Sequence, residues 1–582
     1  MGRSGQAPRG VHDNSHVSRK PIMQLCGIAA AMAGSGHHTT RFNFRGRMLT
    51  GRMLIDLASA PADEWRGDIA IVGAGAAGIT LARQLLAGGQ SVILIESGGL
   101  DYEAATAELN AGRTVGEPYY DLDKARLRFF GGTTAIWGGR CAELDPIDFK
   151  VRPWVKYSGW PFEYDDIRPY YQSARRLLGL PPSDLAAAAE KIGLLEKLAG
   201  DDISVRYWMF DRRFDRFGFA ANRDLVDHPR LTALVHATVR EIIPVPSGGA
   251  VERLDVHGPT GRRVTVRART YILAAGGLEN ARLLLASNSV AKSGLGNEHD
   301  LVGRFFMEHP HARGGRMAKA AVWTVLKAFG KRRSNGVQWA PLLTPSPQLQ
   351  ERQGLLNTAL TIAARPPVAG RRPLMKQAYL RGKHSIAPTR AGRNLWKFHR
   401  RFGREVKQVL GPLRPWWRCV RGKYELALVL RAEQSPNPDS RVTLDRSTDA
   451  TGMPRIRLDW RLQEQDIESG AALVDALAGQ AVAHGLGDVQ AAPWLRDPAA
   501  GWVFDELVTD HPIGGYHHMG TTRMHHDPRQ GVTDGYGRVH GVDNLYVAGS
   551  SLFPTGGWAN PTLTILALSL RTAEHLLSRR AA

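Results

Sequence analysis

The stretch that decides the fold is IAIVGAGAAG, residues 69–78. Its first four residues form a short β-branched run typical of a buried parallel strand. A helix-compatible stretch (79–87) and a second strand-like run (91–95) follow the glycines, and Glu96 comes next. A lone GxGxxG is weak evidence. Here, however, a strand precedes it, a helix follows it, and an acid lies 18 residues past the last glycine, so the context that the motif requires is present.

Each glycine of this signature has a physical reason. Gly73 permits a tight turn, Gly75 lets the backbone approach a pyrophosphate, and Gly78 lets the helix pack closely on the strand. The helix N-terminus presents free N–H groups and the positive end of its dipole to phosphates. Glu96 is suited to accept hydrogen bonds from ribose hydroxyls. The sequence therefore predicts a dinucleotide site.

NAD and FAD share this signature, and the rest of the chain favours FAD. A Rossmann domain for NAD needs roughly 150 contiguous residues of alternating strand and helix. Instead, FFGGTTAIWGG at 129–139 indicates an extended glycine-rich loop suited to the flat face of an isoalloxazine ring. Strand-like runs ending in glycine turns return far downstream, at 271–277 and 544–550, and a helical stretch, 278–285, follows the first of them.

These pieces, in this order, resemble the glucose-methanol-choline (GMC) oxidoreductases, a family of FAD-dependent alcohol and sugar oxidases and dehydrogenases. The resemblance covers residues 68 to 577 and depends most on HHMGT at 517–521 and NPTLT at 560–564. SGWP at 158–161 and SPNPDSRV at 435–442 look like the bacterial sugar and polyol branch, which includes relatives of pyranose oxidase. The implied fold class is α/β: a FAD-binding Rossmann-like domain of discontinuous segments, with a substrate domain built on a mainly antiparallel sheet.

The resemblance also implies the catalytic residues. In this family the histidine of an HxxG pattern is the base above the flavin, and the match falls on His517 rather than His518. The second active-site residue, a His or Asn before the proline of the last helix, is Asn560 here. Alcohol oxidation removes the hydroxyl proton while hydride leaves the same carbon for flavin N5, and imidazole has the ordinary pKa nearest to neutrality. Asn560 would then donate a hydrogen bond to the developing alkoxide.

For both residues a purely structural role remains open as an alternative to the catalytic one. His517 lies in a histidine-rich segment that is also compatible with a surface turn. For Asn560, a simple helix N-cap competes with the active-site role. The histidine spacings match no standard ligand set, so no metal site is expected.

The residues expected around FAD follow from the same resemblance. Pro561 suits the first position of a helix, and the Thr562 N–H with the helix dipole is suited to stabilise negative charge at flavin N1 and C2=O. Ala135, Ile136 and Trp137 stand where some family members carry a FAD-linking histidine, so FAD is expected to be held non-covalently. The expected cofactor-binding residues are Gly73, Gly75, Ala76, Ala77, Gly78, Glu96, Thr133, Thr134, Trp137, Gly138, Val239, Ala275, Gly276, Gly549, Ser550, Asn560, Pro561 and Thr562.

The expected domain organisation is discontinuous. Strand-like runs at 424–431, 441–444 and 455–460 suggest one largely antiparallel sheet over the active site. The segment GRFFMEHP at 303–310 is expected to cross between the domains and reach the substrate. The expected divisions are a tail at 1–65 that is disordered or reflects a misassigned start, a FAD-binding domain at 66–150, 231–310 and 500–582, and a substrate domain at 151–230 and 311–499.

The net charge of +21 at first suggests a nucleic-acid or membrane-surface protein. It is concentrated, however, in two stretches. Residues 365–423 hold 17 basic residues and one acid, residues 1–53 hold 8 and one, and the rest of the chain sums to −2. Within this basic insertion (365–423), apolar residues recur near helical spacing at 395–410. A solvated basic helix and a surface for anionic lipid or an acidic partner both remain open, whereas few aromatics are available for stacking, so no nucleic-acid partner is expected.

The N-terminal segment gives the only targeting signal. Arg19 and Lys20 precede a modest apolar run at 22–33 that looks like a weak signal peptide, and an alternative is translation starting near Met48 or Met53. No segment reaches the roughly 18 to 20 apolar residues of a membrane span. We expect a bacterial cytoplasmic protein, with peripheral membrane contact and export left open.

The three cysteines, Cys26, Cys141 and Cys419, have no spacing that indicates a disulfide framework or a zinc site. The sequence thus predicts a FAD-dependent oxidoreductase that oxidises a CH–OH group of a sugar, glycoside or polyol. Alternatives are a redox-silent lyase on the same fold, an enzyme acting on a non-sugar alcohol, and a non-catalytic FAD-binding protein. The electron acceptor, whether oxygen, a quinone or a protein, is not indicated by any motif.

Overall fold

The computed structural model describes residues 54–180, 185–368, 389–395, 398 and 411–581. All of them belong to the unit Arg52–Ala582. The expected signal segment, both alternative start sites and most of the helical segment at 395–410 lie outside the described residues.

The first sheet is built around the glycine signature. Residues 69–72 form the buried end of β2 (Glu64–Val72), and α1 (Ala76–Ala87) and β3 (Val92–Ile95) follow it as predicted. The strand order is β1-β7-β3-β2-β10-β9-β8, and β19 also pairs with β10. Apart from the antiparallel pairs made by β9, the pairings are parallel. The other strands are β1 (Leu54–Asp56), β7 (Leu231–Val235), β8 (Thr238–Pro244), β9 (Val251–His257), β10 (Arg263–Leu273) and β19 (Leu545–Val547).

Three parts of the chain that are distant in sequence meet at the carboxyl ends of the strands of this sheet. Leu273 at the end of β10 pairs with Val72 of β2 on one side and with Val547 of β19 on the other. In parallel α/β sheets, ligands bind outside the carboxyl ends of the strands. The predicted strands at 271–273 and 545–547 are thus confirmed, and their turns face the end of the signature strand.

The predicted N-terminal tail, residues 1–65, extends too far, because residues 54–65 belong to the folded part. Leu54, Ile55 and Asp56 form β1, which pairs in parallel with β7, and Leu57 is fully buried. Because only three residues pair, their alternation carried too little signal to separate a strand from a tail. Residues 54–65 are therefore part of the sheet region.

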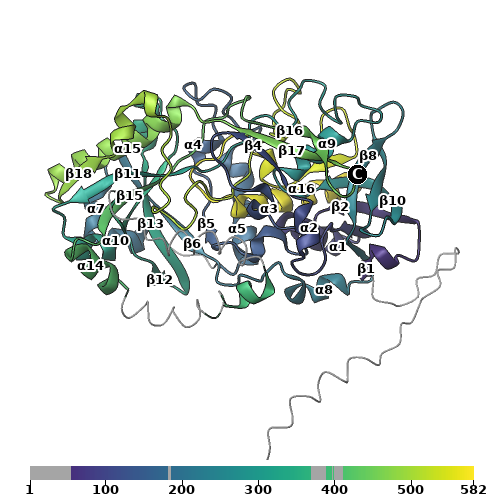
Figure 1. The fold of residues 1–582 in the computed structure, drawn as a ribbon, viewed down its shortest axis with the longest axis horizontal. Helices are drawn as coiled ribbons and strands as arrows, with labels where there is room; N and C mark the ends of the chain where they lie inside the picture. Colours follow the sequence, from purple (N-terminus) through teal and green to yellow (C-terminus); the bar gives the residue numbers. More distant parts are fainter. Residues whose placement is uncertain (1–53, 181–184, 369–388, 396–397, 399–410, 582) are drawn as a thin grey trace, which may run out of the picture. The chain divides into compact units, whose positions relative to one another are not determined.

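The second sheet is antiparallel in every pairing of its described strands. Its order is β18-β11-β15-β14-β13-β6-β5, with β12 paired to β13. In Figure 1 its strands β11, β13, β15 and β18 lie on the left and β2, β8 and β10 of the first sheet on the right. The strands are β5 (Arg140–Cys141), β6 (Ile203–Phe210), β11 (His311–Ala318), β12 (Arg332–Ser334), β13 (Val337–Pro345), β14 (Ala359–Arg365), β15 (Glu425–Arg431) and β18 (Asp488–Ala491).

The expectation that 441–444 and 455–460 share a sheet with 424–431 is wrong. Strands β16 (Arg441–Thr448) and β17 (Pro454–Trp460) form a separate hairpin, and β4 (Gly112–Gly116) adds to β17 in parallel. Alternation along a strand reveals which residues share a face, but not which strand pairs with it. The hairpin therefore pairs with β4, which precedes the glycine-rich loop (129–139) in the sequence, and not with the second sheet.

Two long helices support the sheets. The C-terminal helix α16 (Thr562–Ala581) packs against α1 and α5 (Tyr164–Leu177), and α15 (Glu464–Ala483) contacts β18 and β11. The N-terminus of α15 has a reciprocal capping box between Gln463 and Asp466. The other helices are α2 (Ala104–Glu108), α3 (Leu122–Ala125), α4 (Pro146–Phe149), α6 (Leu185–Glu190), α7 (Gly193–Leu198), α8 (Arg223–Val226), α9 (Glu279–Ala286), α10 (Val322–Ala328), α11 (Pro347–Gln353) and α14 (Leu413–Val420).

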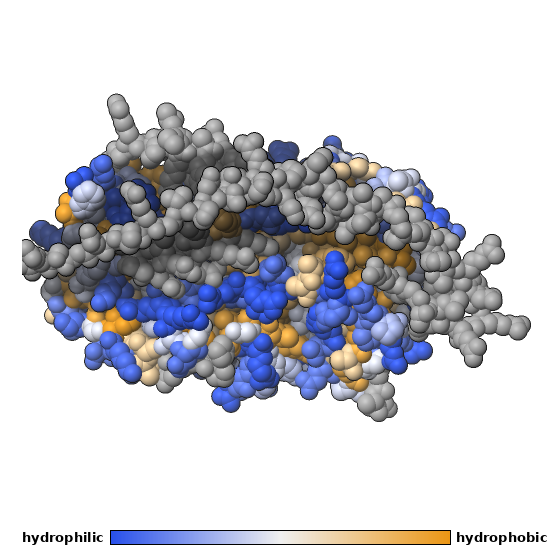
Figure 2. All heavy atoms as spheres, turned by 90° about the horizontal axis from the view of Figure 1, so that it is seen from below, coloured by the Kyte–Doolittle hydropathy of each residue, from blue (hydrophilic) through white to orange (hydrophobic). Residues whose placement is uncertain are grey.

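The face drawn in Figure 2 mixes hydrophilic and apolar residues, and the apolar ones lie in patches between polar ones. Within the described ranges, none of the helices combines the length and the apolar character that crossing a bilayer requires. Cys141 is buried and Cys419 half-buried, and both are free thiols.

Candidate active site

A cavity, here called the cofactor cavity, opens at the carboxyl ends of β2, β3 and β10, where it is lined by Val72, Ile95 and Ala274. It collects most of the residues predicted to bind FAD. Those that line it are Gly73, Gly75, Ala76, Ala77, Glu96, Thr133, Thr134, Val239, Ala275, Gly276, Gly549 and Ser550. Gly78, Trp137, Gly138, Asn560, Pro561 and Thr562 were predicted with them and are not among its lining residues.

The glycine signature has the geometry that a bound pyrophosphate needs. Gly73 has a φ of 106°, and a Cβ there would lie 2.6 Å from the Ala274 carbonyl oxygen. A Cβ on Gly78 would lie 2.0 Å from the carbonyl oxygen of Gly73, so Gly78 serves helix packing rather than contact with a ligand. By contrast, a Cβ on Gly75 would meet no atom within 4 Å. The open space beside Gly75 at the start of α1 is compatible with the predicted approach of a phosphate to the backbone.

Glu96 holds the turns on both sides of the cavity. Its Oε2 accepts a hydrogen bond from the Ala74 N–H at 2.9 Å, and its Oε1 accepts one from the Gly98 N–H at 2.9 Å. Burial raises the pKa of Glu96 against the hydrogen bonds that lower it. Each carboxylate oxygen keeps acceptor capacity, so the side chain can bind ribose hydroxyls as predicted and also order the backbone.

Charged side chains that were not predicted also line the cavity. Arg126 and Arg128 both pair with Glu279, at 2.9 and 3.2 Å. Burial raises the pKa of Glu279, but the charges of Arg282, Arg126 and Arg128 outweigh it and lower the pKa to about 2. The alternating arginines directly before the glycine-rich loop were the available signal. Their role depends on a carboxylate 150 residues away, which no local pattern reveals.

The catalytic candidates His517 and Asn560 lie together. Asn560 Nδ2 is 3.0 Å from His517 Nε2. On its other side, His517 Nδ1 is 2.7 Å from His309 Nδ1, and His309 Nε2 is 2.8 Å from the Gly557 carbonyl oxygen. The side chain of His517 is 14% exposed, so the surface-turn alternative is wrong.

These contacts fix which nitrogen of His517 carries the proton. A carbonyl oxygen only accepts, so His309 Nε2 must donate to Gly557. In neutral His309 the Nδ1 is then an acceptor, and His517 Nδ1 donates to it. Burial, followed by the charge of His309, lowers the pKa of His517 well below its ordinary value, and burial also lowers the pKa of His309. Both rings are neutral, and His517 Nε2 presents its lone pair toward Asn560.

The Gly557 carbonyl is itself held in place by a buried ion pair. The Gly557 N–H donates to Glu433 Oε1 at 3.1 Å, and both oxygens of Glu433 accept from Arg152, at 2.7 and 2.9 Å. Both side chains of the pair are at most 1% exposed. Bidentate pairing fixes the orientation of the carboxylate as well as its position. His309 is thus oriented by a rigid, fully enclosed network.

Glu308 fixes the backbone that carries His517. Its carboxylate accepts hydrogen bonds from the backbone N–H groups of His309, Gly515 and His517 and from the Tyr119 hydroxyl at 2.7 Å. Burial raises the pKa of Glu308 to about 7 against these donors. The segment 303–310 was predicted to reach the substrate, and its Glu308 and His309 lie in direct contact with the His517 segment.

The end of the chain brings the two sites together. Asn560 contacts His517, Pro561 accepts the Ile565 N–H at 2.8 Å at the start of α16, and Ile565 lines the cofactor cavity. His518, next to the predicted base, lines the same cavity. The His517 site, comprising His517, His309, Glu308 and Asn560, therefore adjoins the cofactor cavity.

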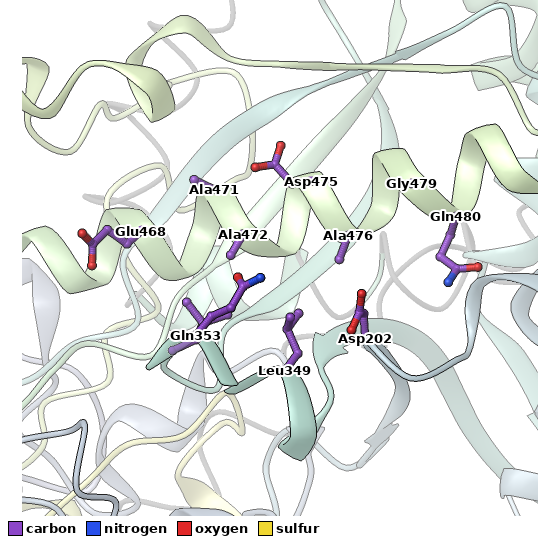
Figure 3. A pocket seen from close by; sticks show the side chains of 11 residues that line it. Asp202, Leu349, Gln353, Glu468, Ala471, Ala472, Asp475, Ala476, Gly479 and Gln480 are labelled. Atoms are coloured by element: carbon purple, nitrogen blue, oxygen red, sulfur yellow. The ribbon is translucent and has the colours of Figure 1, made fainter. Parts of the chain in front are cut away.

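A second hollow lies along α15, away from these residues (Figure 3). Its lining residues include Leu349, Gln353, Ala472 and Ala476, and it shares none with the cofactor cavity. In the part of the chain that the structure describes, no group of three or more His, Cys, Asp or Glu side chains is arranged to hold a metal ion.

The fold and the cavity define a FAD-dependent oxidoreductase, and the profile described as FAD dependent oxidoreductase matches residues 68–291. The profile described as GMC oxidoreductase matches residues 436–569. The matches to the FAD dependent oxidoreductase and GMC oxidoreductase models confirm the predicted family and fold class.

Relatives and a solved structure agree with this assignment. The 6'''-hydroxyparomomycin C oxidase of Streptomyces lividus is 26% identical, over 88% of this chain and 93% of its own length. The 2-methyl-1,2-propanediol dehydrogenase of Mycolicibacterium austroafricanum is 26% identical, over 77% of this chain and 80% of its own. The crystal structure of pyridoxine 4-oxidase from Mesorbium loti superposes with a TM-score of 0.53 at 19% identity, covering 87% of this chain and 98% of that one, which supports the fold.

Proposed function

We propose that the protein oxidises a CH–OH group of a sugar, glycoside or polyol, with His517 as the base and Asn560 as its partner. The observation that carries the proposal is the position of the His517 imidazole beside the cofactor cavity. Its unprotonated Nε2 lies 3.0 Å from the Asn560 amide nitrogen. The names of relatives that act on an aminoglycoside and on a diol support the substrate class.

In this mechanism the substrate hydroxyl donates to His517 Nε2 and receives a hydrogen bond from Asn560 Nδ2. His517 takes the hydroxyl proton, and the resulting imidazolium is stabilised through Nδ1–H by His309. Asn560 stabilises the negative charge that develops on the oxygen. Bound FAD supplies the hydride acceptor. A positioned base of this kind contributes roughly 10²- to 10⁴-fold to the rate.

The cofactor is proposed to be held non-covalently. Ala135, Ile136 and Trp137 occupy the loop position where a linking histidine would stand. The proposed contacts are the residues already predicted, with Gly73, Gly75 and Glu96 toward the nucleotide and the segment from Gly549 to Thr562 toward the ring. Acid precipitation tests the linkage: a colourless pellet with FAD in the supernatant is expected, and a yellow pellet would contradict it.

The domain division is proposed to follow the two large sheets except at β5, residues 140–141, which lies in the FAD-binding range but pairs with β6 of the second sheet. The FAD-binding part comprises 66–150, 231–310 and 500–582, extended at its start to β1, and the substrate part comprises 151–230 and 311–499. The antiparallel strands of the second sheet support this division. A role of the basic insertion at 365–423 in docking on anionic lipid or an acidic partner stays a proposal. Liposome binding that survives charge reversal of Arg400, Arg401 and Arg404 would argue against the lipid form.

The decisive experiment is anaerobic mixing of the holoenzyme with a panel of sugars, glycosides, polyols and simple alcohols while flavin absorbance is followed. Bleaching by members of the sugar and polyol classes supports the proposal, and admitting air then separates an oxidase from a dehydrogenase that needs a quinone or a protein acceptor. If no alcohol bleaches the flavin, the proposed function is wrong, and a redox-silent lyase on the same fold is favoured.

A further inference from the structure

Two arginines of the second sheet form no ion pair with any residue that the structure describes. Arg140, the first residue of β5, directly follows the glycine-rich loop, and Arg431 ends β15. The Arg140 guanidinium lies 5.3 Å from the centroid of the Trp208 ring, and the Arg431 guanidinium lies 5.0 Å from the same centroid. Two cations therefore share one indole ring.

The lack of an ion pair sets these two arginines apart from three other interior arginines. Arg152 pairs with Glu433, Arg282 with Asp449, and Arg313 with Asp505, at 2.6 to 2.7 Å. Among the described residues, neither Arg140 nor Arg431 forms an ion pair. Burial lowers the pKa of Arg140, and the charge of the Asp510 carboxylate partly offsets that effect. Arg431 donates to the Thr361 hydroxyl at 3.1 Å, and Arg140 Nε is buried without a hydrogen-bond partner.

As whole residues, Arg140 and Arg431 are less deeply buried than a third interior arginine that forms no ion pair. Arg523 lacks a carboxylate too, but it is 2% exposed and enclosed between Phe305 and the Tyr157 carbonyl. Arg140 and Arg431 are only half-buried. Burial, and next the charges of Arg140 and Arg365, lower the pKa of Arg431 well below its ordinary value. Cations so placed are stabilised strongly by an incoming anion.

The pair faces the His517 site. Arg431 pairs directly with His311 across neighbouring strands, so their side chains share a face of the sheet. The Trp208 ring that holds both cations lies 6.3 Å from the ring of Trp558, two residues before Asn560. The charge of Arg140 contributes to the lowered pKa of His517. These three links connect Arg140 and Arg431 to the surroundings of the His517 site.

We propose that Arg140 and Arg431 bind an oxyanion group, a carboxylate or phosphate ester, on the alcohol that the enzyme oxidises. Guanidinium groups match both oxyanions with paired N–H donors, and Trp208 holds them in place. The substrate is then an acidic sugar or polyol, such as a uronic acid or a sugar phosphate. This inference rests on the proposed function and narrows its substrate class.

Matched substrate pairs test the inference: glucose against glucuronate, galactose against galacturonate, and glucose against glucose 6-phosphate. We expect the acidic member to have the higher kcat/KM. Arg431→Gln and Arg140→Gln should each lower the acid-to-neutral ratio of kcat/KM by roughly 10- to 100-fold. Arg333→Gln, which removes an exposed charge from β12 of the same sheet, is the matched control and should leave the ratio unchanged. Neutral members preferred by the wild type would overturn the inference.

A titration without turnover separates this inference from the proposed function. The oxidised holoenzyme is titrated with acetate or phosphate, which carry no oxidisable alcohol, at constant ionic strength set by chloride, and the flavin spectrum is recorded. A saturable change with an oxyanion but not with chloride supports the site and tells carboxylate from phosphate. No change with any of them overturns it. A saturable change with no bleaching by any alcohol would instead overturn the proposed function alone.

Discussion

The cofactor cavity and the His517 site adjoin each other but differ in the kind of residues that form them. The cavity is formed at strand ends and glycine turns that each have a local sequence pattern, and Glu96 accepts hydrogen bonds from two of the turns. The His517 site is formed by side chains from segments 208 residues apart, joined through His309 and Gly557. A site at strand ends and turns leaves a local signature in the sequence, whereas a site made of distant side chains leaves only isolated residues.

The largest expected effect is at the base itself. His517→Ala should lower kcat/KM by roughly 10²- to 10⁴-fold, because proton removal then falls to water. FAD content should stay at the wild-type level, since His517 is not among the residues lining the cofactor cavity. Anaerobic stopped-flow reduction measures the rate. His526→Ala, an exposed histidine of the same segment, is the control. A variant that loses FAD along with activity would show that the two sites are not separate.

The next effect tests whether His309 sets the tautomer of His517. His309→Leu removes the acceptor of the His517 Nδ1–H and should lower kcat roughly 10- to 100-fold, whereas His309→Asn keeps an acceptor oxygen near that position and should recover much of the loss. Because tautomer populations do not depend on pH, the loss should be constant from pH 7 to 9. A loss that disappears at high pH would point to an altered pKa instead.

A pair of glycine variants probes the cavity side of the comparison. Gly78→Ala forces a Cβ to 2.0 Å from the Gly73 carbonyl oxygen, so we expect a loss of about 1–3 kcal/mol in the free energy of unfolding. Gly75→Ala meets no protein atom and should leave the apoprotein as stable as before while weakening FAD binding. Denaturant unfolding of apoprotein and FAD titration separate the two effects. Equal destabilisation by both variants would contradict the predicted approach of a phosphate at Gly75.

The smallest effect concerns pH and His518, which lies between the two sites. Burial, and next the charge of Arg126, lower the pKa of His518 to about 3. The unfolded chain therefore binds a proton below about pH 6.5 that the folded chain does not, and stability falls as the pH drops from there. His518→Gln should lose this dependence, by up to about 1.4 kcal/mol per pH unit relative to wild type. Parallel slopes of unfolding free energy between pH 6.5 and 5 would contradict a neutral buried His518.

The same contrast explains what the sequence could predict. Residues 69–78, Glu96 and the strands at 271–273 and 545–547 were placed correctly, because each stands in a local strand–turn pattern. His517 and Asn560 came from the family resemblance and lie together as a pair. The tautomer-setting role of His309 was not predictable, since it depends on the Gly557 carbonyl 248 residues further along the chain.

Sheet membership was predicted less well than strand position. Strands at 441–448 and 454–460 exist, but their partner is β4 rather than the second sheet. Pairing is decided by long-range packing, here with Trp460 fully buried and its indole N–H donating to Gln434 at 2.9 Å. The lack of ion pairs at Arg140 and Arg431 could not be predicted from the sequence either, because it can be recognised only once the neighbours in space are known.

The placement of β19 has a consequence for biosynthesis. This strand, residues 545–547, adds to β10 at the edge where the cofactor cavity opens, and Asn560 and α16 follow it. Chains fold from the N-terminus as they are made, so the early strands of the first sheet are synthesised long before the segment that completes their cavity. During synthesis the nascent protein therefore carries a nucleotide site that lacks its last strand, His517 and Asn560. The complete cavity therefore exists only once almost the whole polypeptide has been made.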